Sequence, residues 1–179
     1  TPLYSSAASD VYKRQGEEIT TTRPSDRVRR GIALARERHP IFPESSVMEN
    51  LKIAGYLRTR AEIKEVTEYT FKLFPALVPL KSRKAGFLSG GEQQMLAIGM
   101  SLMVKPKLLL LDEPLLGLSP MMQKSLVTAI CNLQKESEIT VLITEQFARP
   151  VLPIIDRGYV IENGMLTLSG TCLLYTSDA

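Results

Sequence analysis

The chain has 179 residues, of which 44% are hydrophobic and 23% are charged, and its formal net charge at pH 7 is +3. These values are typical of a single soluble domain that can bury a sizeable core. The weak positive charge is scattered along the chain, so composition gives no support for nucleic-acid binding. The apolar runs are far too short to span a bilayer, and the two cysteines form neither a disulfide framework nor a metal-binding cluster.

Both ends of the chain carry short polar segments. Residues 5–15 (Ser-Ser-Ala-Ala-Ser-Asp-Val-Tyr-Lys-Arg-Gln) resemble the translation of a transposon-type sequencing-library adaptor, and residues 172–179 resemble the same adaptor translated from its opposite strand. The alternative is a natural polar tail at each end, a kind of segment that is usually disordered. We expect 1–15 and 172–179 to be adaptor-like tails outside the fold, and 16–171 to be the domain.

The first half of the domain is expected to contain short elements followed by a small helical subdomain at 47–84. Apolar residues recur at helical spacing in two stretches, and Pro75 and Pro79 end the second one. Ser25 is the candidate N-cap of the first short helix. In chain order, the expected elements are a strand remnant and turn at 16–22, a short surface helix or loop at 24–30, a strand at 31–35, a loop at 36–46 and helices at 47–57 and 60–74.

From residue 90 onward, apolar strands alternate with helices, a pattern that favours a parallel sheet. The strands are continuous apolar runs, which is typical of strands buried on both faces. Pro150 and Pro153 would disrupt a helix interior, so the helix after the second strand is expected to be short or bent, and Asn163-Gly164 predicts a hairpin turn. The expected elements are helices at 92–104 and 121–135, strands at 108–111 and 140–144, and a C-terminal β-hairpin at 158–162 and 165–169.

Asp112 and Glu113 directly follow the apolar strand at 108–111. The strand therefore places both carboxylates at its carboxyl end, where ligands bind in open α/β sheets. A carboxylate there can hold Mg²⁺ through water, and its neighbour can orient or deprotonate the water that attacks a γ-phosphate. Asp112 is the candidate metal ligand and Glu113 the candidate catalytic residue. Acidic pairs at strand exits are also common without any function, so the pair alone does not define a site.

A second candidate site lies where the helix at 92–104 begins, in the run Ser89, Gly90, Gly91 and Glu92. Ser89 can cap the helix, and the two glycines let backbone N–H groups approach an anion. The amino end of the helix adds positive potential at the same place. The alternative is an ordinary glycine-rich helix start.

Leu-Ser-Gly-Gly-Glu-Gln-Gln at 88–94 and Leu-Leu-Asp-Glu-Pro at 110–114 together resemble the signature motif and Walker B strand of ATP-binding-cassette (ABC) ATPases. The resemblance implies an α/β P-loop NTPase domain with ATP and Mg²⁺ as cofactors. It also implies a head-to-tail dimer, in which Ser89 to Glu92 contact the γ-phosphate of nucleotide held by the opposite subunit. A Gly-x-x-x-x-Gly-Lys-Ser/Thr phosphate loop (Walker A) does not occur in the sequence, so we expect 16–171 to be a truncated ABC domain without ATPase activity of its own.

The same resemblance implies roles for three further residues. Ser119 takes the place that Asp usually holds in the D-loop, beside the nucleotide. Gln146 takes the place of the switch histidine, and a glutamine can hydrogen-bond a γ-phosphate but does not titrate near neutral pH. Glu37 takes the place of the Q-loop glutamine, which contacts nucleotide and senses Mg²⁺. From the residues alone, Gln146 is equally well interpreted as a solvated loop residue and Glu37 as part of a charged surface loop.

Further segments narrow the resemblance to one branch of the family. Ile-Phe-Pro at 41–43, Glu-Asn-Leu at 49–51 and Asp-Arg-Gly-Tyr-Val-Ile-Glu-Asn-Gly at 156–164 look like the LivF-type ATP-binding subunit of branched-chain amino-acid importers. This implies ATP-driven import of leucine, isoleucine or valine with a second ATPase subunit, integral membrane permease subunits and, indirectly, a periplasmic substrate-binding protein. The subunit would lie peripherally on the cytoplasmic face of a bacterial-type plasma membrane and would bind no nucleic acid.

The chain also departs from that branch. Met100 stands where relatives usually carry Arg, and Ala35-Arg36 replaces a usual Val-Pro. The open alternatives are an ABC ATPase of another importer, such as one for urea or amides, a non-transport ABC ATPase that works on DNA or ribosomes, and a non-catalytic interaction fragment. The short helical insert argues against the non-transport class, whose members usually carry long coiled-coil inserts or tandem cassettes.

Overall fold

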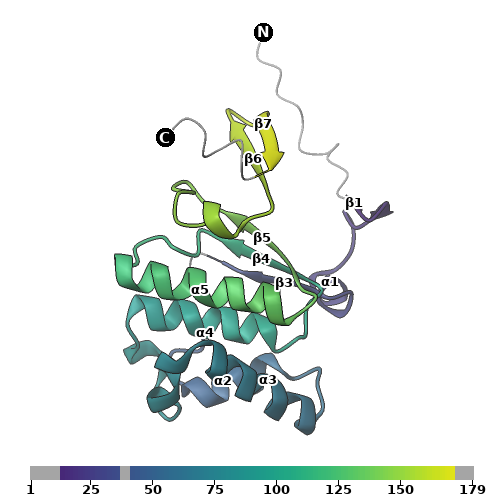
Figure 1. The fold of residues 1–179 in the computed structure, drawn as a ribbon. Coiled ribbons are helices and arrows are strands. Elements are labelled where there is room, and N and C mark those ends of the chain that lie inside the picture. Colours follow the sequence, from purple (N-terminus) through teal and green to yellow (C-terminus); the bar gives the residue numbers. More distant parts are fainter. Residues whose placement is uncertain (1–12, 37–40, 172–179) are drawn as a thin grey trace.

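The structure is a computed structural model that describes residues 13–36 and 41–171. Figure 1 shows a parallel sheet, two helices on one of its faces, and a group of further helices beneath them. The expected α/β fold with a parallel sheet, a helical region and a C-terminal hairpin is confirmed. The elements of the sheet and helical layers are β3 (Ile32–Ala35), α2 (Val47–Ala54), α3 (Arg60–Leu73), η1 (Pro75–Leu80), η2 (Ala85–Phe87), α4 (Gly90–Leu102), β4 (Leu108–Asp112), α5 (Pro120–Glu136) and β5 (Thr140–Thr144).

Strand β4 is the middle strand of the sheet, and β3 and β5 pair with it in parallel on either side. On one face of the sheet, Ala35, Leu109 and Leu111 are buried beneath α4 and α5. On the other face, Leu34 and Leu142 are 43% and 49% exposed. The expectation that the strands are buried on both faces is therefore wrong for the part of the chain that the structure describes. We call the side of Leu34 and Leu142 the open sheet face.

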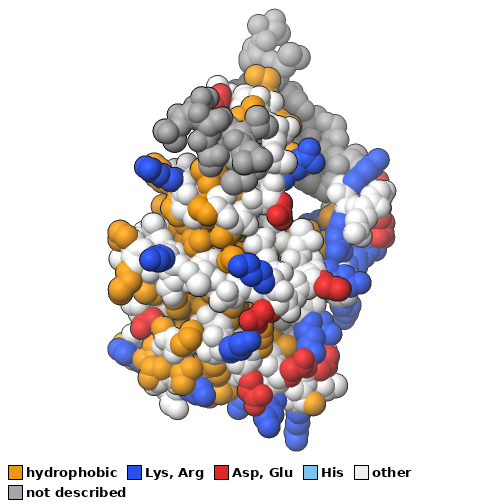
Figure 2. Space-filling view, viewed as in Figure 1, with side chains coloured by type: hydrophobic (Ala, Val, Ile, Leu, Met, Phe, Trp, Pro, Cys, Tyr) orange, Lys and Arg blue, Asp and Glu red, His pale blue; other side chains and the backbone are white. Residues whose placement is uncertain are grey.

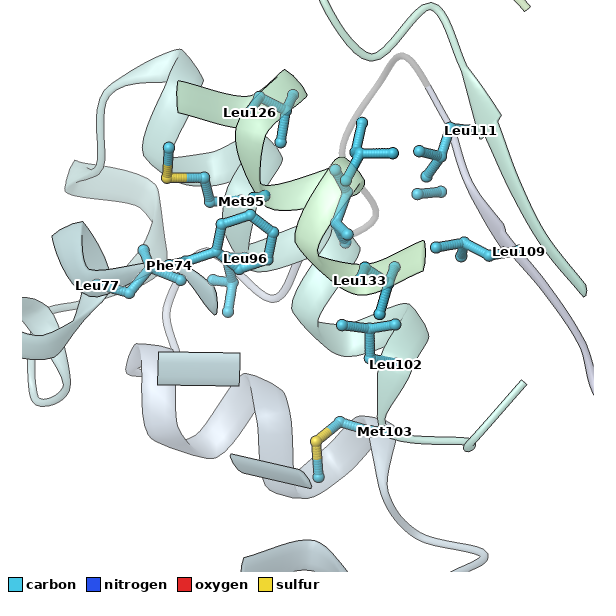
Figure 3. Packing of buried hydrophobic residues seen from close by; sticks show 14 of the residues in the cluster. Phe74, Leu77, Met95, Leu96, Leu102, Met103, Leu109, Leu111, Leu126 and Leu133 are labelled. Atoms are coloured by element: carbon cyan, nitrogen blue, oxygen red, sulfur yellow. The ribbon is translucent and has the colours of Figure 1, made fainter. Parts of the chain in front are cut away.

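Helix α4 lies between the sheet layer and the layer that contains α2 and α3, and most of its residues are buried. Figure 3 shows its Leu96 and Leu102 among core residues that come from both layers. Gly99 allows the two helical layers to approach closely, because a Cβ atom there would lie 2.6 Å from Cγ2 of Thr70 and 3.3 Å from Cδ2 of Leu51. The predicted helix at 92–104 is confirmed, and it begins two residues earlier.

The predicted helical region is also confirmed in its elements. Helices α2 and α3 correspond to the stretches expected at 47–57 and 60–74, and the prolines after α3 start the 3₁₀ helix η1. Both α-helices begin with a capping box, in which Ser46 pairs with Glu49 and Thr59 pairs with Glu62. Each box satisfies backbone N–H groups that a helix start leaves without partners. These caps fix where the two helices begin.

The peripheral elements are short. Helix α1 has Arg23 at its N-cap position and Pro24 at its first turn, so the prediction that Ser25 is the cap is wrong: Ser25 lies inside the helix. Pro is favoured at the first helical position because it has no N–H to satisfy. The remaining elements are β1 (Lys13–Arg14), β2 (Glu17–Glu18), α1 (Pro24–Arg29), η3 (Leu152–Ile154), β6 (Arg157–Glu162) and β7 (Met165–Thr171).

Both proline-based and turn-based predictions near the carboxyl end are confirmed. The segment with Pro150 and Pro153 contains only the three-residue 3₁₀ helix η3. Strands β6 and β7 form an antiparallel hairpin, and its two turn residues, Asn163 and Gly164, have φ values of 50° and 77°. Positive φ at both positions is what a type I′ hairpin turn requires. Among the described residues, none of the helices has the length and apolar character needed to cross a membrane.

Asn50 anchors the segment that leads into the helical region. Its side chain is fully buried, and its Oδ1 accepts a hydrogen bond of 2.7 Å from the Phe42 N–H. Its Nδ2 donates to the backbone oxygens of Phe42, Ser45 and Ser46 at 2.9 to 3.2 Å. One amide therefore binds a whole turn of backbone: it accepts from the Phe42 N–H and adds a second hydrogen bond to three backbone oxygens.

Replacement of Asn50 by alanine tests this anchor. We expect Asn50→Ala to lower the free energy of unfolding by about 2–3 kcal/mol, because the Phe42 N–H loses its acceptor and three backbone oxygens each lose one hydrogen bond. Lys52→Ala, on an exposed position of the same helix, is the matched control and should change stability by less than about 0.5 kcal/mol. Urea denaturation of the two variants measures both values, and equal losses would contradict the anchoring role.

Candidate functional site

The two carboxylates predicted from the sequence lie at the carboxyl end of the central strand. Asp112 is the last residue of β4 and pairs in register with Thr144, the last residue of β5. The Thr144 Oγ1 donates a 2.7 Å hydrogen bond to Asp112 Oδ1. The Asp112 side chain is exposed at this end of the sheet, so one carboxylate oxygen is oriented by Thr144 while the group stays accessible. The predicted position of the pair is confirmed.

Glu113 has an uncommon backbone conformation. Its φ is +48°, in the left-handed region that non-glycine residues rarely adopt. The Glu113 N–H donates a 3.0 Å hydrogen bond to the Thr144 carbonyl oxygen, which continues the pairing of β4 with β5 by one residue. Such conformations cluster at functional sites, where the surrounding structure holds them in place. Here the chain turns sharply away from the sheet directly at the candidate catalytic residue.

The segment after Glu113 is held by two side chains. Leu115 donates its N–H to Oε1 of Glu145 at 2.8 Å. Gln123, in α5, donates Nε2 to the backbone oxygen of Leu118 at 3.2 Å and more weakly to that of Leu115. Ser119, predicted beside the nucleotide, is the N-cap of α5 and its side chain accepts from the Met122 N–H. The loop 114–119 is thus tied to β5 and to α5.

Ser89 is confirmed as the N-cap of α4. Its Oγ accepts from the Glu92 N–H at 3.4 Å, and Glu92 Oε2 accepts from the Ser89 N–H at 2.7 Å. The carboxylate of Glu92 therefore turns back onto the helix start, and its predicted contact with a cofactor stays a prediction. The reciprocal bonds form a capping box that fixes the amino end of α4.

The two glycines of this run have different surroundings. A Cβ atom on Gly90 would meet nothing within 4 Å, whereas one on Gly91 would lie 2.5 Å from Cε of Met122. Gly90 thus leaves open space at the helix start, where N–H groups and the helix dipole attract anions. Gly91 instead lets the starts of α4 and α5 pack together, which brings Ser119 to the same end of the molecule.

This end of the molecule is also the end at which β4 and β5 finish, because both helices run antiparallel to the strands (Figure 1). Gln146 is the second residue after β5 and is exposed. Figure 2 shows hydrophobic side chains gathered on the surface where α4 and α5 begin. The exposed hydrophobic residues of that region include Phe87, Leu116 and Met121.

The carboxylates at this end of the sheet suit a Mg²⁺ site completed by water and substrate phosphates better than a site made of protein ligands alone. Glu37, the second predicted metal ligand, lies outside the described residues. Within residues 13–36 and 41–171, there is no group of three or more His, Cys, Asp or Glu side chains that could hold a metal. Mg²⁺ is usually bound by one or two carboxylates together with waters and substrate phosphates, and Asp112 offers one such carboxylate.

Glu145 was missed by the sequence interpretation, which weighed only its neighbour Gln146. The sequence did contain a signal for Glu145: an acidic residue directly follows the apolar strand β5, as Glu113 directly follows β4. Burial raises the pKa of the Glu145 carboxyl, the hydrogen bond from Leu115 opposes this, and the nearby Glu113 carboxylate raises the pKa further. A half-buried acid beside a second acid is a common feature of functional sites.

The sequence matches the ABC transporter family over residues 3–116. The chain belongs to the ABC transporter family. The ABC match begins inside the segment 1–15 that the sequence suggested is a tail, so the boundary at residue 16 stays a prediction. With the fold and the carboxylate pair on β4, the match shows an ABC ATP-binding domain.

Two relatives of this ABC domain are named for branched-chain amino acid transport. The high-affinity branched-chain amino acid transport ATP-binding protein BraG of Pseudomonas aeruginosa is 41% identical over 165 residues, which cover 92% of this chain and 70% of that protein. The probable branched-chain amino acid transport ATP-binding protein LivF of Archaeoglobus fulgidus is 38% identical, with coverages of 87% and 66%. The chain thus spans about two thirds of the length of these relatives.

Solved ABC structures share the fold. A nucleotide-free ATP-binding cassette from an ABC transporter is 30% identical with a TM-score of 0.71, and the match covers 87% of this chain and 67% of that one. A cassette solved in its ADP conformation is 30% identical with a TM-score of 0.70, and the coverages are 87% and 66%. CbiO1 of Clostridium perfringens is 25% identical with a TM-score of 0.79, over 92% and 66% of the two chains.

The raised pKa of Glu145 predicts a pH-dependent stability difference between the wild type and Glu145→Gln. The Glu145 carboxyl has an ordinary pKa of 4.5 in the unfolded chain and a higher pKa in the folded protein. Folding therefore loses stability as pH rises from the lower pKa through the higher one. Glutamine does not titrate. We expect the wild type to become less stable relative to Glu145→Gln between pH 4 and pH 7, as measured by urea denaturation at each pH. A difference that is constant with pH would contradict the assignment.

Proposed function

We propose that the protein is the ATP-binding and ATP-hydrolysing subunit of an ABC importer of branched-chain amino acids. The observation that supports this most is the 41% and 38% identity to two ATP-binding proteins named for that transport, from a bacterium and an archaeon. The molybdenum import ATP-binding protein ModC of Escherichia coli is 31% identical, so other importers are more distant relatives. Import of urea or amides, or a non-transport function, remains the alternative.

The site supports a division of roles between its two carboxylates. Glu113 is proposed to orient or deprotonate the water that attacks the γ-phosphate, and it lies where the backbone turns at the carboxyl end of β4. Asp112, oriented by Thr144, is proposed to hold Mg²⁺ together with Glu37. The bound Mg²⁺ supplies charge neutralisation on the phosphates. Gln146 is proposed to hydrogen-bond the γ-phosphate from the end of β5.

The start of α4 is proposed to act on nucleotide held by a second subunit. Its open space at Gly90 and the positive end of its helix dipole suit a phosphate, and Ser89, Gly91 and Glu92 fix the helix start. Ser119 lies at the same end of the molecule, beside exposed hydrophobic residues. These features support a head-to-tail dimer whose two ATP sites lie between the subunits, with the signature of one facing the nucleotide of the other.

The remaining partners and the location follow from the same proposal. The ATPase pair would work with integral permease subunits and, through them, with a periplasmic substrate-binding protein. It would lie peripherally on the cytoplasmic face of a bacterial-type plasma membrane. We further propose that the 179-residue polypeptide is a truncated subunit that does not hydrolyse ATP by itself, because its sequence contains no Walker A loop.

Steady-state ATPase assays test the role of Glu113. The complete reading frame is recovered from the source DNA, and the encoded subunit is assayed with its permease. We expect Glu113→Gln to lower kcat at least about a hundredfold, as is usual when a general base is lost. Glu138→Gln, an exposed acid before β5 at the opposite end of the sheet, is the matched control and should keep wild-type turnover.

Three outcomes would contradict parts of the proposal. A complete subunit that does not hydrolyse ATP would contradict the ATPase function, and full turnover in Glu113→Gln would contradict the role of that residue. Turnover by the 179-residue chain that Glu113→Gln abolishes would contradict its proposed inactivity. Uptake of labelled leucine, compared with labelled urea, by cells that depend on the assembled importer distinguishes the substrates.

A further inference from the structure

Two consecutive residues at the end of β5 hold the whole exit of β4. The Thr144 hydroxyl bonds to Asp112, and the Thr144 carbonyl oxygen accepts the Glu113 N–H at 3.0 Å. The Glu145 carboxylate then accepts the Leu115 N–H at 2.8 Å. These contacts follow the chain through the carboxylate pair and into the loop 114–119.

The sequence makes the contact from Glu145 unusually important for this turn. Pro114 has no N–H, so the stretch 113–115 has only two backbone donors. One of them, on Glu113, is bound by the Thr144 backbone, and the other, on Leu115, is bound by Glu145. Among the described residues, Glu145 is therefore the only side chain that accepts a hydrogen bond from a backbone N–H of this stretch.

The bond from Leu115 to Glu145 lies two residues after the strained position, Glu113. Glu113 has a φ of +48°, which is held only where neighbouring structure determines it. Anchors on both sides of Pro114 fix the direction in which the Glu113 side chain leaves the backbone. A small misplacement of a reacting group can lower the rate by a large factor. The hydrogen bond from Leu115 to Glu145 can therefore affect the rate through the position of Glu113, without contact to the substrate.

We infer that Glu145 is a positioning residue of the ATPase site: through the Leu115 N–H it fixes the backbone turn that aims Glu113. The inference rests on the proposed function. The hydrogen bond from Leu115 to Glu145 also joins two loops at the carboxyl end of β4 and β5. Glu145 immediately precedes Gln146, and Leu115 belongs to the loop 114–119, which leads to Ser119. A movement of the Gln146 loop is thereby transmitted to the segment that follows the catalytic residue.

Two conservative variants separate this role from a purely electrostatic one. Glu145→Gln keeps an oxygen acceptor at the same reach and removes the charge, whereas Glu145→Asp keeps the charge and is one methylene shorter. In the complete subunit, we expect Glu145→Gln to keep kcat within about threefold, and Glu145→Asp to lower kcat by about ten- to a hundredfold with little change in the KM for ATP. Glu138→Asp, an acid of the same type away from the site, is the control and should keep wild-type kcat.

The opposite pattern, with Glu145→Asp active and Glu145→Gln impaired, would overturn the inference, as would wild-type kcat in both variants. An equal loss in both would also overturn it, since it would assign the effect to something other than the acceptor. Thermal unfolding of each variant confirms that the comparison is between folded proteins.

A second measurement does not depend on ATP hydrolysis. Hydrogen exchange of the Leu115 amide, followed by NMR in the 179-residue chain, reports the bond itself. We expect protection in the wild type and in Glu145→Gln, and faster exchange by at least about tenfold in Glu145→Asp. An unprotected Leu115 amide in the wild type would overturn the inference even if the subunit is an ATPase. If the wild-type complete subunit does not hydrolyse ATP, the proposed function fails, and this exchange pattern still decides whether Glu145 holds the turn.

Discussion

Helix α4 packs against β3 and β4 on one side and against α2 and α3 on the other, so it joins the sheet layer to the helical layer. Its position requires the absence of a side chain at Gly99, where the helical layer approaches within van der Waals distance. At its amino end, Gly91 does the same for the start of α5. These two close approaches set the height and direction of α4 relative to β4. As a result, the start of α4, with its free space at Gly90, lies at the same end of the molecule as the carboxylates of β4.

Much of this fold could be predicted from the sequence, because long elements carry strong periodic patterns. Helices α3, α4 and α5 and strands β4 and β5 were found to within two residues, and the hairpin followed from Asn163-Gly164. The cap of α1 was predicted wrongly, since Ser25 and Pro24 both signal a helix start and the proline took the first position. The packing of the sheet on one face only was not predicted, because an apolar run looks the same whether one or both faces are covered.

The site was predictable in part for a similar reason. Asp112, Glu113 and Ser89 belong to local motifs, and their positions depend on the strand and helix that carry them. Glu145 acts on Leu115, which is 30 residues away in sequence. No local pattern reports such a contact, since it depends on the register between β4 and β5 and on the left-handed turn at Glu113. Long-range hydrogen bonds of this kind become visible only when the strands are placed side by side.

The open sheet face has a consequence for the mechanics of the site. Parallel sheets in α/β proteins are normally covered on both sides, and here Leu34 and Leu142 are left partly in water. Burial of these leucines would contribute about 1 kcal/mol for each half-exposed side chain, so any layer that covers them also stiffens β4 and β5 from the second side. The rigidity with which Asp112 and Glu113 are presented therefore depends on the open sheet face, where Leu142 lies two residues before Thr144. A layer bound to the open sheet face would reduce the motion of the Asp112 and Glu113 carboxylates without changing the residues that surround them.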